Sequence, residues 1–163
     1  MLSLPDTTRK HDEAIRAHVD RLPGIADLIA DGSLDELRTR FEPEYEFIAG
    51  QLAPHVETVE AALYPELEKV MGCCHSMLGM RREHQELARL IGSLGRYRAS
   101  LESGQLGPAE QTGLRRALYR LHAILKVHLA EEALYVGVLE HNLSDQEKDV
   151  LARAMDHALA EPI

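Results

Sequence analysis

The chain has 163 residues, which suits a single domain with one sizeable core, so we treat residues 1–163 as one domain. Its 27 acidic residues against 18 basic ones give a net charge of −9, which argues against a nucleic-acid partner. No run of about 18 apolar residues is present, so no membrane-spanning segment is expected.

The first two helical stretches are predicted to meet near residue 33. Gly32 and Ser33 end the first stretch, and Ser33 and Glu36 have the spacing of a capping box that opens the second. Proline cannot donate a backbone hydrogen bond and its ring collides with the preceding turn. We therefore expect kinks or breaks in these two stretches at Pro23, Pro43, Pro54 and Pro65.

Two further long stretches and a tail helix follow. Residues 72–76 separate the second stretch from the third, and residues 104–108 separate the third from the fourth, with Pro108 at a plausible first helical position. Ser144 and Glu147 form another capping box, which predicts a short helix over about residues 145–159.

Apolar residues recur at alternating steps of three and four along each long stretch, as in Leu118, Leu121 and Leu125 of the fourth. Four helices with such seams and short connections predict an all-α fold, an antiparallel up-down-up-down four-helix bundle over about residues 8–140 with a short C-terminal helix. Strand-like alternation is absent from the sequence.

The cysteines indicate a reducing environment. Cys73 and Cys74 are the only two, and neighbouring cysteines make no disulfide framework. The first residues carry no apolar run behind a basic stretch, so no signal peptide is expected. We therefore expect a cytoplasmic protein in which Cys73 and Cys74 are free thiols, with a redox role as the alternative.

Polar residues interrupt the seams where a core is expected. Burial of an unpaired carboxylate or imidazole is costly, so such residues in all four seams need partners. The residues on inward positions are His11, His18, His55, His84, His128 and Glu132.

The heights of these histidines follow from hairpin arithmetic, because residues equidistant from a helix–helix loop lie at the same level. His84 and His128 are symmetric about residue 106, and His11 and His55 are symmetric about residue 33. His18 lies two turns along the helix from His11 and is either a supporting group or, if Pro23 shifts the helix, the ligand itself.

Imidazole and carboxylate donors with few thiols suit iron, zinc or manganese. His128 and Glu132 are one helical turn apart, so both can reach one metal ion or a metal pair. A bound cation would also supply the charge that keeps a buried Glu132 ionised.

This pattern of histidines and glutamates resembles the hemerythrin-like (HHE cation-binding) domain family over about residues 8–140. The resemblance implies a non-haem di-iron centre, with two irons per chain and one as the alternative, that binds or reacts with O2, NO or peroxide; zinc and manganese are less favoured. The segments that carry it are Lys10 to Ile15 (KHDEAI), Leu52 to Pro65 (LAPHVETVEAALYP), Met80 to His84 (MRREH) and His128 to Glu132 (HLAEE).

The chain departs from the family pattern at two positions. The glutamate expected four residues after His55 is Val59, so either Glu60, five residues after His55, replaces it or the site is incomplete. Oxygen-carrying relatives have a further histidine where this chain has Met80, which argues against a stable oxygen carrier.

Three functions remain open. The leading hypothesis is an iron protein that binds, senses or detoxifies a small diatomic gas or peroxide. One alternative is a peroxide-decomposing iron enzyme on the same site, although the sequence shows no separate acid/base pair that would indicate it. The other is a helical interaction module with a degenerate metal site.

Overall fold

All regular structure in the computed structural model is helical over the residues that it describes, 4–31 and 33–160. The predicted all-α class is therefore confirmed for this part of the chain. None of the described helices is long and apolar enough to cross a membrane. The elements are α1 (Leu4–Val19), α2 (Leu22–Asp31), α3 (Leu34–Phe47), η1 (Ile48–Leu52), α4 (Ala53–Thr58), η2 (Val59–Leu63), α5 (Tyr64–Met71), α6 (Leu78–Glu102), α7 (Pro108–Asn142) and α8 (Asp145–Ala160).

The helix boundaries fall at the predicted capping residues. Ser33 accepts a hydrogen bond from the Glu36 backbone N–H at 3.3 Å at the start of α3, while Gly32 lies outside the described residues. Pro108 is the first residue of α7. At the start of α8 the Ser144 N–H donates to the Glu147 carboxylate at 2.9 Å, as a capping box requires.

The four prolines act differently on the first two stretches. The first stretch breaks between α1 and α2, directly before Pro23, whereas Pro43 lies inside an unbroken α3. In the second stretch, the wide helical turns η1 and η2 each end two residues before a proline, Pro54 and Pro65 respectively. A turn with hydrogen bonds over five residues makes room for a ring that the α-helical turn would clash with.

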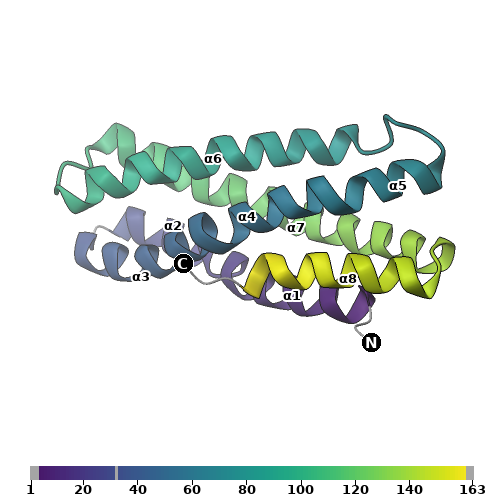
Figure 1. The fold of residues 1–163 in the computed structure, drawn as a ribbon. Helices are drawn as coiled ribbons and strands as arrows, with labels where there is room; N and C mark the ends of the chain where they lie inside the picture. The colour runs from purple at the N-terminus through teal and green to yellow at the C-terminus, as the bar shows by residue number, and fades with distance from the viewer. Residues whose placement is uncertain (1–3, 32, 161–163) are drawn as a thin grey trace.

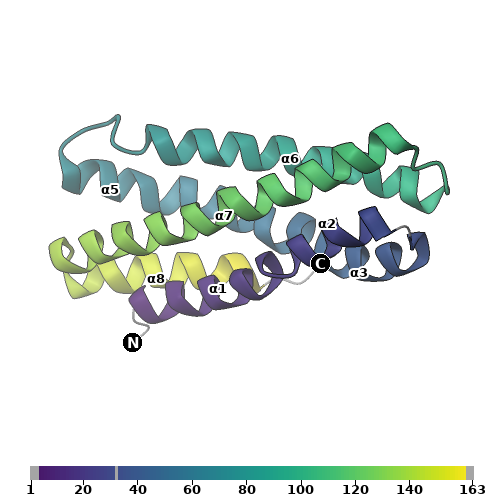
Figure 2. The ribbon, with the colours of Figure 1, turned by 180° about the vertical axis from the view of Figure 1, so that it is seen from behind.

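The helices pack lengthwise into an elongated body (Figure 1 and Figure 2). The helix α7 lies against α1, α2, α5 and α6, so it runs through the middle of the contacts. The helix α8 folds back along α1 and also contacts α4 and η2. Its Ala152 and Met155 are fully buried, so this C-terminal helix is part of the core.

The apolar core consists of two separate clusters of buried side chains. The first contains Ile15, Leu52, Leu87 and Leu125, and the second contains Val59, Tyr64, Met80 and Val136, among others. The second, third and fourth helical stretches each contribute side chains to both clusters. The boundary between the two clusters is a level that crosses all three of these stretches.

Candidate metal centre

Buried polar side chains occupy the level between the two apolar clusters. On α6, His84 lies between Met80 of the second cluster and Leu87 of the first. In the same way, His55 lies between Leu52 of the first cluster and Val59 of the second, and on α7 Leu125 belongs to the first cluster and Val136 to the second. The buried polar residues of this level, with exposed fractions of 1–7%, are His11, Asp12, His55, His84, His128 and Glu132.

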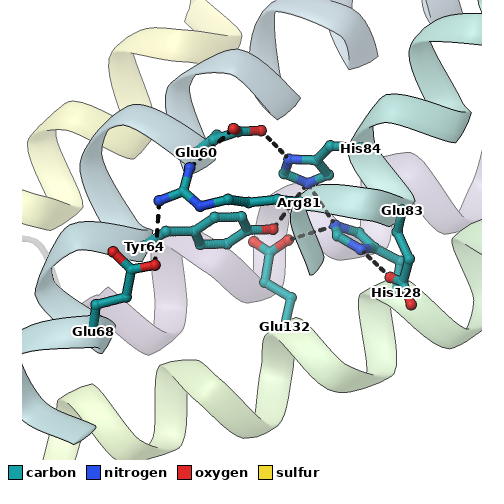
Figure 3. Close-up of polar contacts among 8 residues, drawn as sticks. All are labelled: Glu60, Tyr64, Glu68, Arg81, Glu83, His84, His128 and Glu132. Atoms are coloured by element: carbon teal, nitrogen blue, oxygen red, sulfur yellow. Dashed lines mark hydrogen bonds and ion pairs between the residues drawn. The ribbon is translucent and has the colours of Figure 1, made fainter. Parts of the chain in front are cut away.

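His84 is held by partners on both ring nitrogens (Figure 3). Its Nδ1 lies 3.0 Å from a carboxylate oxygen of Glu60, and its Nε2 lies 2.9 Å from the Tyr64 hydroxyl. A carboxylate can only accept, so the Nδ1–H of His84 donates to Glu60 and Nε2 carries the lone pair. The Tyr64 hydroxyl therefore donates to Nε2.

His128 is oriented in the same way. Its Nδ1 donates to a carboxylate oxygen of Glu83 at 2.8 Å, which leaves the lone pair on Nε2. This Nε2 lies 3.1 Å from the Nε2 of His84 and 3.6 Å from a carboxylate oxygen of Glu132. Two neutral imidazoles oriented in this way turn lone pairs toward each other, an arrangement that a cation between or beside them would relieve.

His11 and His55 form a second pair, in edge-to-face contact with ring centroids 5.7 Å apart. The contacts within both pairs confirm the levels expected from hairpin arithmetic. Both nitrogens of His55 and the Nδ1 of His11 are buried without a hydrogen-bond partner, as is one oxygen of Glu132. Buried polar atoms are nearly always satisfied, so this half of the level presents free donor atoms.

The protein environment favours the neutral form of His55 and His84. Burial, together with the nearby His11, His128 and His84, lowers the pKa of His55 to about 3. Burial and the neighbouring His128 likewise lower the pKa of His84 to about 4. Neutral imidazole is the form that binds a metal ion.

The carboxyl groups of the level are affected in the opposite direction. Burial, reinforced by the charge of Asp12, raises the pKa of Glu132 to about 8. Burial also raises the pKa of Asp12 to about 6, against the opposing charge of Arg16. Each shift reflects the cost of a buried negative charge, which a bound cation would offset.

Two of the predicted site residues lie outside the buried level. His18 is part-exposed, stacks on Phe47 with centroids 3.6 Å apart and contacts the buried Glu44 carboxylate, which also accepts from Arg21 at 2.6 Å. The break before Pro23 does not turn His18 toward His55, so of the two helix-one candidates the structure brings only His11 into the level.

Glu60 lies on the outer side of His84. Its carboxylate accepts from Arg81 at 2.9 Å and from the Nδ1–H of His84, and its side chain is 37% exposed. Against the raising effect of burial, these two hydrogen bonds hold the pKa of Glu60 below its usual range. Glu60 thus orients an imidazole and does not itself point to the lone-pair side.

Three further residues, Asp12, Tyr64 and Glu83, belong to this network although sequence reasoning did not include them among the site residues. Glu83 directly precedes His84 but bonds His128 on the neighbouring helix, a contact that no spacing on one helix reveals. Asp12 directly follows His11 in a segment that mixes acidic and basic residues, a composition that does not indicate burial. Tyr64 reaches His84 because of the wide turn η2.

Among the side chains that the structure describes, no three from His, Cys, Asp or Glu are already close enough to bind one metal ion together. Metal binding at this level therefore requires side-chain rotation or a donor of another residue type. Cys73 and Cys74 are free and exposed, in the connection between α5 and α6.

The model of one protein family, described as the Hemerythrin HHE cation binding domain, matches residues 4–137 of the chain. This range includes all the buried histidines and Glu132. No curated protein and no solved structure shows a significant match.

Proposed function

Because the chain belongs to the hemerythrin HHE cation-binding domain family, we propose that it binds non-haem iron at the level between the two apolar clusters. The proposed ligands are His11, His55, His84, His128 and Glu132. Two irons per chain are expected, with one as the alternative, and zinc or manganese are less favoured. The proposal includes the antiparallel up-down-up-down bundle as the scaffold and, from the two free cysteines, a reducing cytoplasm.

The observation that carries the proposal is the orientation of His84 and His128. Two carboxylates, Glu60 and Glu83, accept the Nδ1–H groups of these histidines. The two Nε2 lone pairs are therefore directed to the same region, and the Nε2 atoms lie 3.1 Å apart. Histidine ligands of metals are generally oriented in this way by an acceptor on the other nitrogen. An apolar core gains nothing from such an arrangement, because two facing acceptors repel each other.

The unpartnered donor atoms test whether the residues fit iron. Imidazole nitrogen and carboxylate oxygen suit Fe, Zn and Mn, and no thiolate that would favour a softer ion lies among the buried polar residues described. The lone-pair nitrogen of His55 and the free oxygen of Glu132 supply metal-binding atoms that the folded chain otherwise leaves unsatisfied. The residues present therefore fit the metal that the family implies.

Burial restricts what can react at this level. The five proposed ligands are at most 6% exposed, and both apolar clusters exclude water from them. Iron, when bound, would supply a redox centre with affinity for small ligands. Access limited to small molecules supports O2, NO or peroxide as the species that is bound, sensed or detoxified.

Metal analysis of the purified protein, with its absorption spectrum, tests the proposal. We expect about two irons per chain and a near-ultraviolet band from an oxygen bridge. Glu132→Ala should abolish stable loading, whereas His18→Ala, outside the level, should keep it. Wild-type protein without iron after growth in iron-rich medium would overturn the proposal, and equal loading of both variants would overturn the ligand assignment.

A second candidate rests on Val59. This residue is fully buried in the second apolar cluster, where the family resemblance expects a carboxylate. A helical interaction module with a degenerate metal site would show this substitution, and metal-free wild-type protein would favour it.

A further inference from the structure

The second helical stretch lacks a carboxylate directed at the level between the two apolar clusters, where iron is proposed to bind. Val59 is fully buried among apolar side chains, and the Glu60 carboxylate is turned outward to Arg81 and to the Nδ1 side of His84. His55 is thus the one proposed ligand from this stretch. An oxygen donor from this stretch must therefore come from another residue type.

The wide turn η2 places Tyr64 on the inner face of this stretch. The backbone N–H of Tyr64 bonds to the carbonyl of Val59, five residues earlier, so both side chains face the core and both are fully buried. In an uninterrupted α-helix a five-residue step turns a side chain well away from the first one. Wide turns of this kind inside α-helices are frequent at functional sites.

The Tyr64 hydroxyl is directed at the lone-pair side of the histidines (Figure 3). It lies 2.9 Å from the Nε2 of His84, which is 3.1 Å from the Nε2 of His128. Glu132 reaches the same place, with an oxygen 3.6 Å from the Nε2 of His128. Four potential donor atoms, one of them a phenol oxygen, therefore face one another across three helical stretches.

The ring of Tyr64 is fixed in this position. It stacks on His84 with centroids 5.2 Å apart and planes within 19°, and the Arg81 guanidinium lies 5.4 Å from its centroid. A fixed ring holds its hydroxyl where it is, so little conformational freedom is lost when the oxygen binds a cation.

We propose that Tyr64 is an iron ligand, whose phenolate oxygen takes the place of the carboxylate missing at Val59. This inference rests on the iron site proposed above. As the oxygen–iron bond forms, the phenol O–H bond is broken, the proton passes to water and no electron is transferred. A phenolate is a hard, anionic donor that favours ferric over ferrous iron. The site then suits reaction with peroxide better than reversible O2 binding, which needs ferrous iron.

Visible spectroscopy of the ferric protein tests this ligand separately from iron loading. Phenolate bound to ferric iron gives an intense visible charge-transfer band, with phenolate vibrations in the resonance Raman spectrum excited in that band. We expect both in the wild type, and their loss in Tyr64→Phe with at least half of the iron retained. Tyr135→Phe, which alters a half-buried tyrosine beside the same apolar cluster, should keep both.

Each outcome separates the two proposals. Wild-type protein without iron overturns the iron site and this inference with it. Iron without the phenolate band, or a band that persists in Tyr64→Phe, overturns this inference alone. Growth on ring-deuterated tyrosine provides a measurement on the unaltered chain, because the Raman bands must shift if tyrosine is the ligand. Unshifted bands would also overturn the assignment.

Discussion

The two histidine pairs lie at one level of the molecule but differ in what holds them. His84 and His128 each donate Nδ1–H to a glutamate, and their rings have centroids 4.7 Å apart. His55 has no hydrogen-bond partner on either nitrogen, and His11 lacks one on Nδ1. The protein itself supplies the hydrogen-bond partners of one half of the level, whereas it leaves polar atoms of the other half unsatisfied.

Because of this difference, leucine substitutions in the two pairs should change the free energy of unfolding of the metal-free protein in opposite directions. His84→Leu leaves the buried Tyr64 hydroxyl without a partner and Glu60 with Arg81 alone, which should lower the free energy of unfolding by about 1–3 kcal/mol. His55→Leu removes two unsatisfied nitrogens from an apolar environment and should be neutral or stabilise by up to about 2 kcal/mol. Urea denaturation in the presence of a chelator measures both values. Equal losses from the two variants would contradict the proposed difference between the pairs.

The glutamates behind the organised pair should tune metal affinity without binding metal. We expect Glu83→Ala and Glu60→Ala to weaken iron binding about 10–100-fold, the usual cost of losing the group that orients a histidine ligand. Competition with a chromophoric chelator measures the change. Glu66→Ala, which removes a carboxylate paired with Lys69 on the surface of α5, is the matched control and should have no effect.

Glu60→Gln sharpens this comparison further. The carboxamide oxygen still accepts from the Nδ1–H of His84. If Glu60 only orients His84, glutamine should therefore largely restore the iron affinity. If Glu60 is a ligand in its own right, glutamine should bind iron as poorly as alanine does.

The pH dependence of stability should report Glu132 in the metal-free protein. Its pKa is about 8 when folded against an ordinary value of 4.5, so between these values the unfolded state binds fewer protons and stability falls as pH rises. The buried His55 and His84, with lowered pKa values, give the opposite slope only below their ordinary value of 6.5. From pH 6.5 to 8 we therefore expect a net loss of about 1–2 kcal/mol.

Urea denaturation across this pH range, with chelator present, checks the expected slope. Glu132→Gln should abolish the loss, whereas Glu131→Gln, at the half-buried neighbouring position, should preserve it. A stability that rises from pH 6.5 to 8 in the wild type would show that Glu132 is ionised in the folded state.

The sequence was sufficient for the helical class, the caps and the levels of four histidines. Loop-centred counting works for His84 and His128 because α6 and α7 are regular helices joined by a short loop. It could not decide between His11 and His18, because the sequence does not give the rotation of the first stretch at the break before Pro23. In the structure this break does not bring His18 inward. Contacts between helices, such as Glu83 with His128, depend on side-chain directions that no single-helix pattern contains.

The inner face of the second stretch was harder to predict. A constant period of 3.6 residues places Ala62 on the seam after Val59, but the structure buries Leu63 and Tyr64 more deeply. The wide turn η2 accounts for this shift of one or two residues, and Pro65 indicates its position only in hindsight. Proline marks where an α-helix is disturbed but not whether the chain bends, breaks or widens.

The wide turns η1 and η2 also bear on how such a site can change between related sequences. A turn of this kind contains one residue more than an α-helical turn, so it is equivalent to a single-residue insertion accommodated without breaking the helix. Deletion of Ala61 or Ala62 would close η2 into an α-helical turn and leave Tyr64 four residues after Val59, still on the inner face. The same deletion within a regular helix would instead rotate everything after it by about 100°. The wide turn thus lets the second stretch gain or lose one residue without changing which side chain it presents to the core.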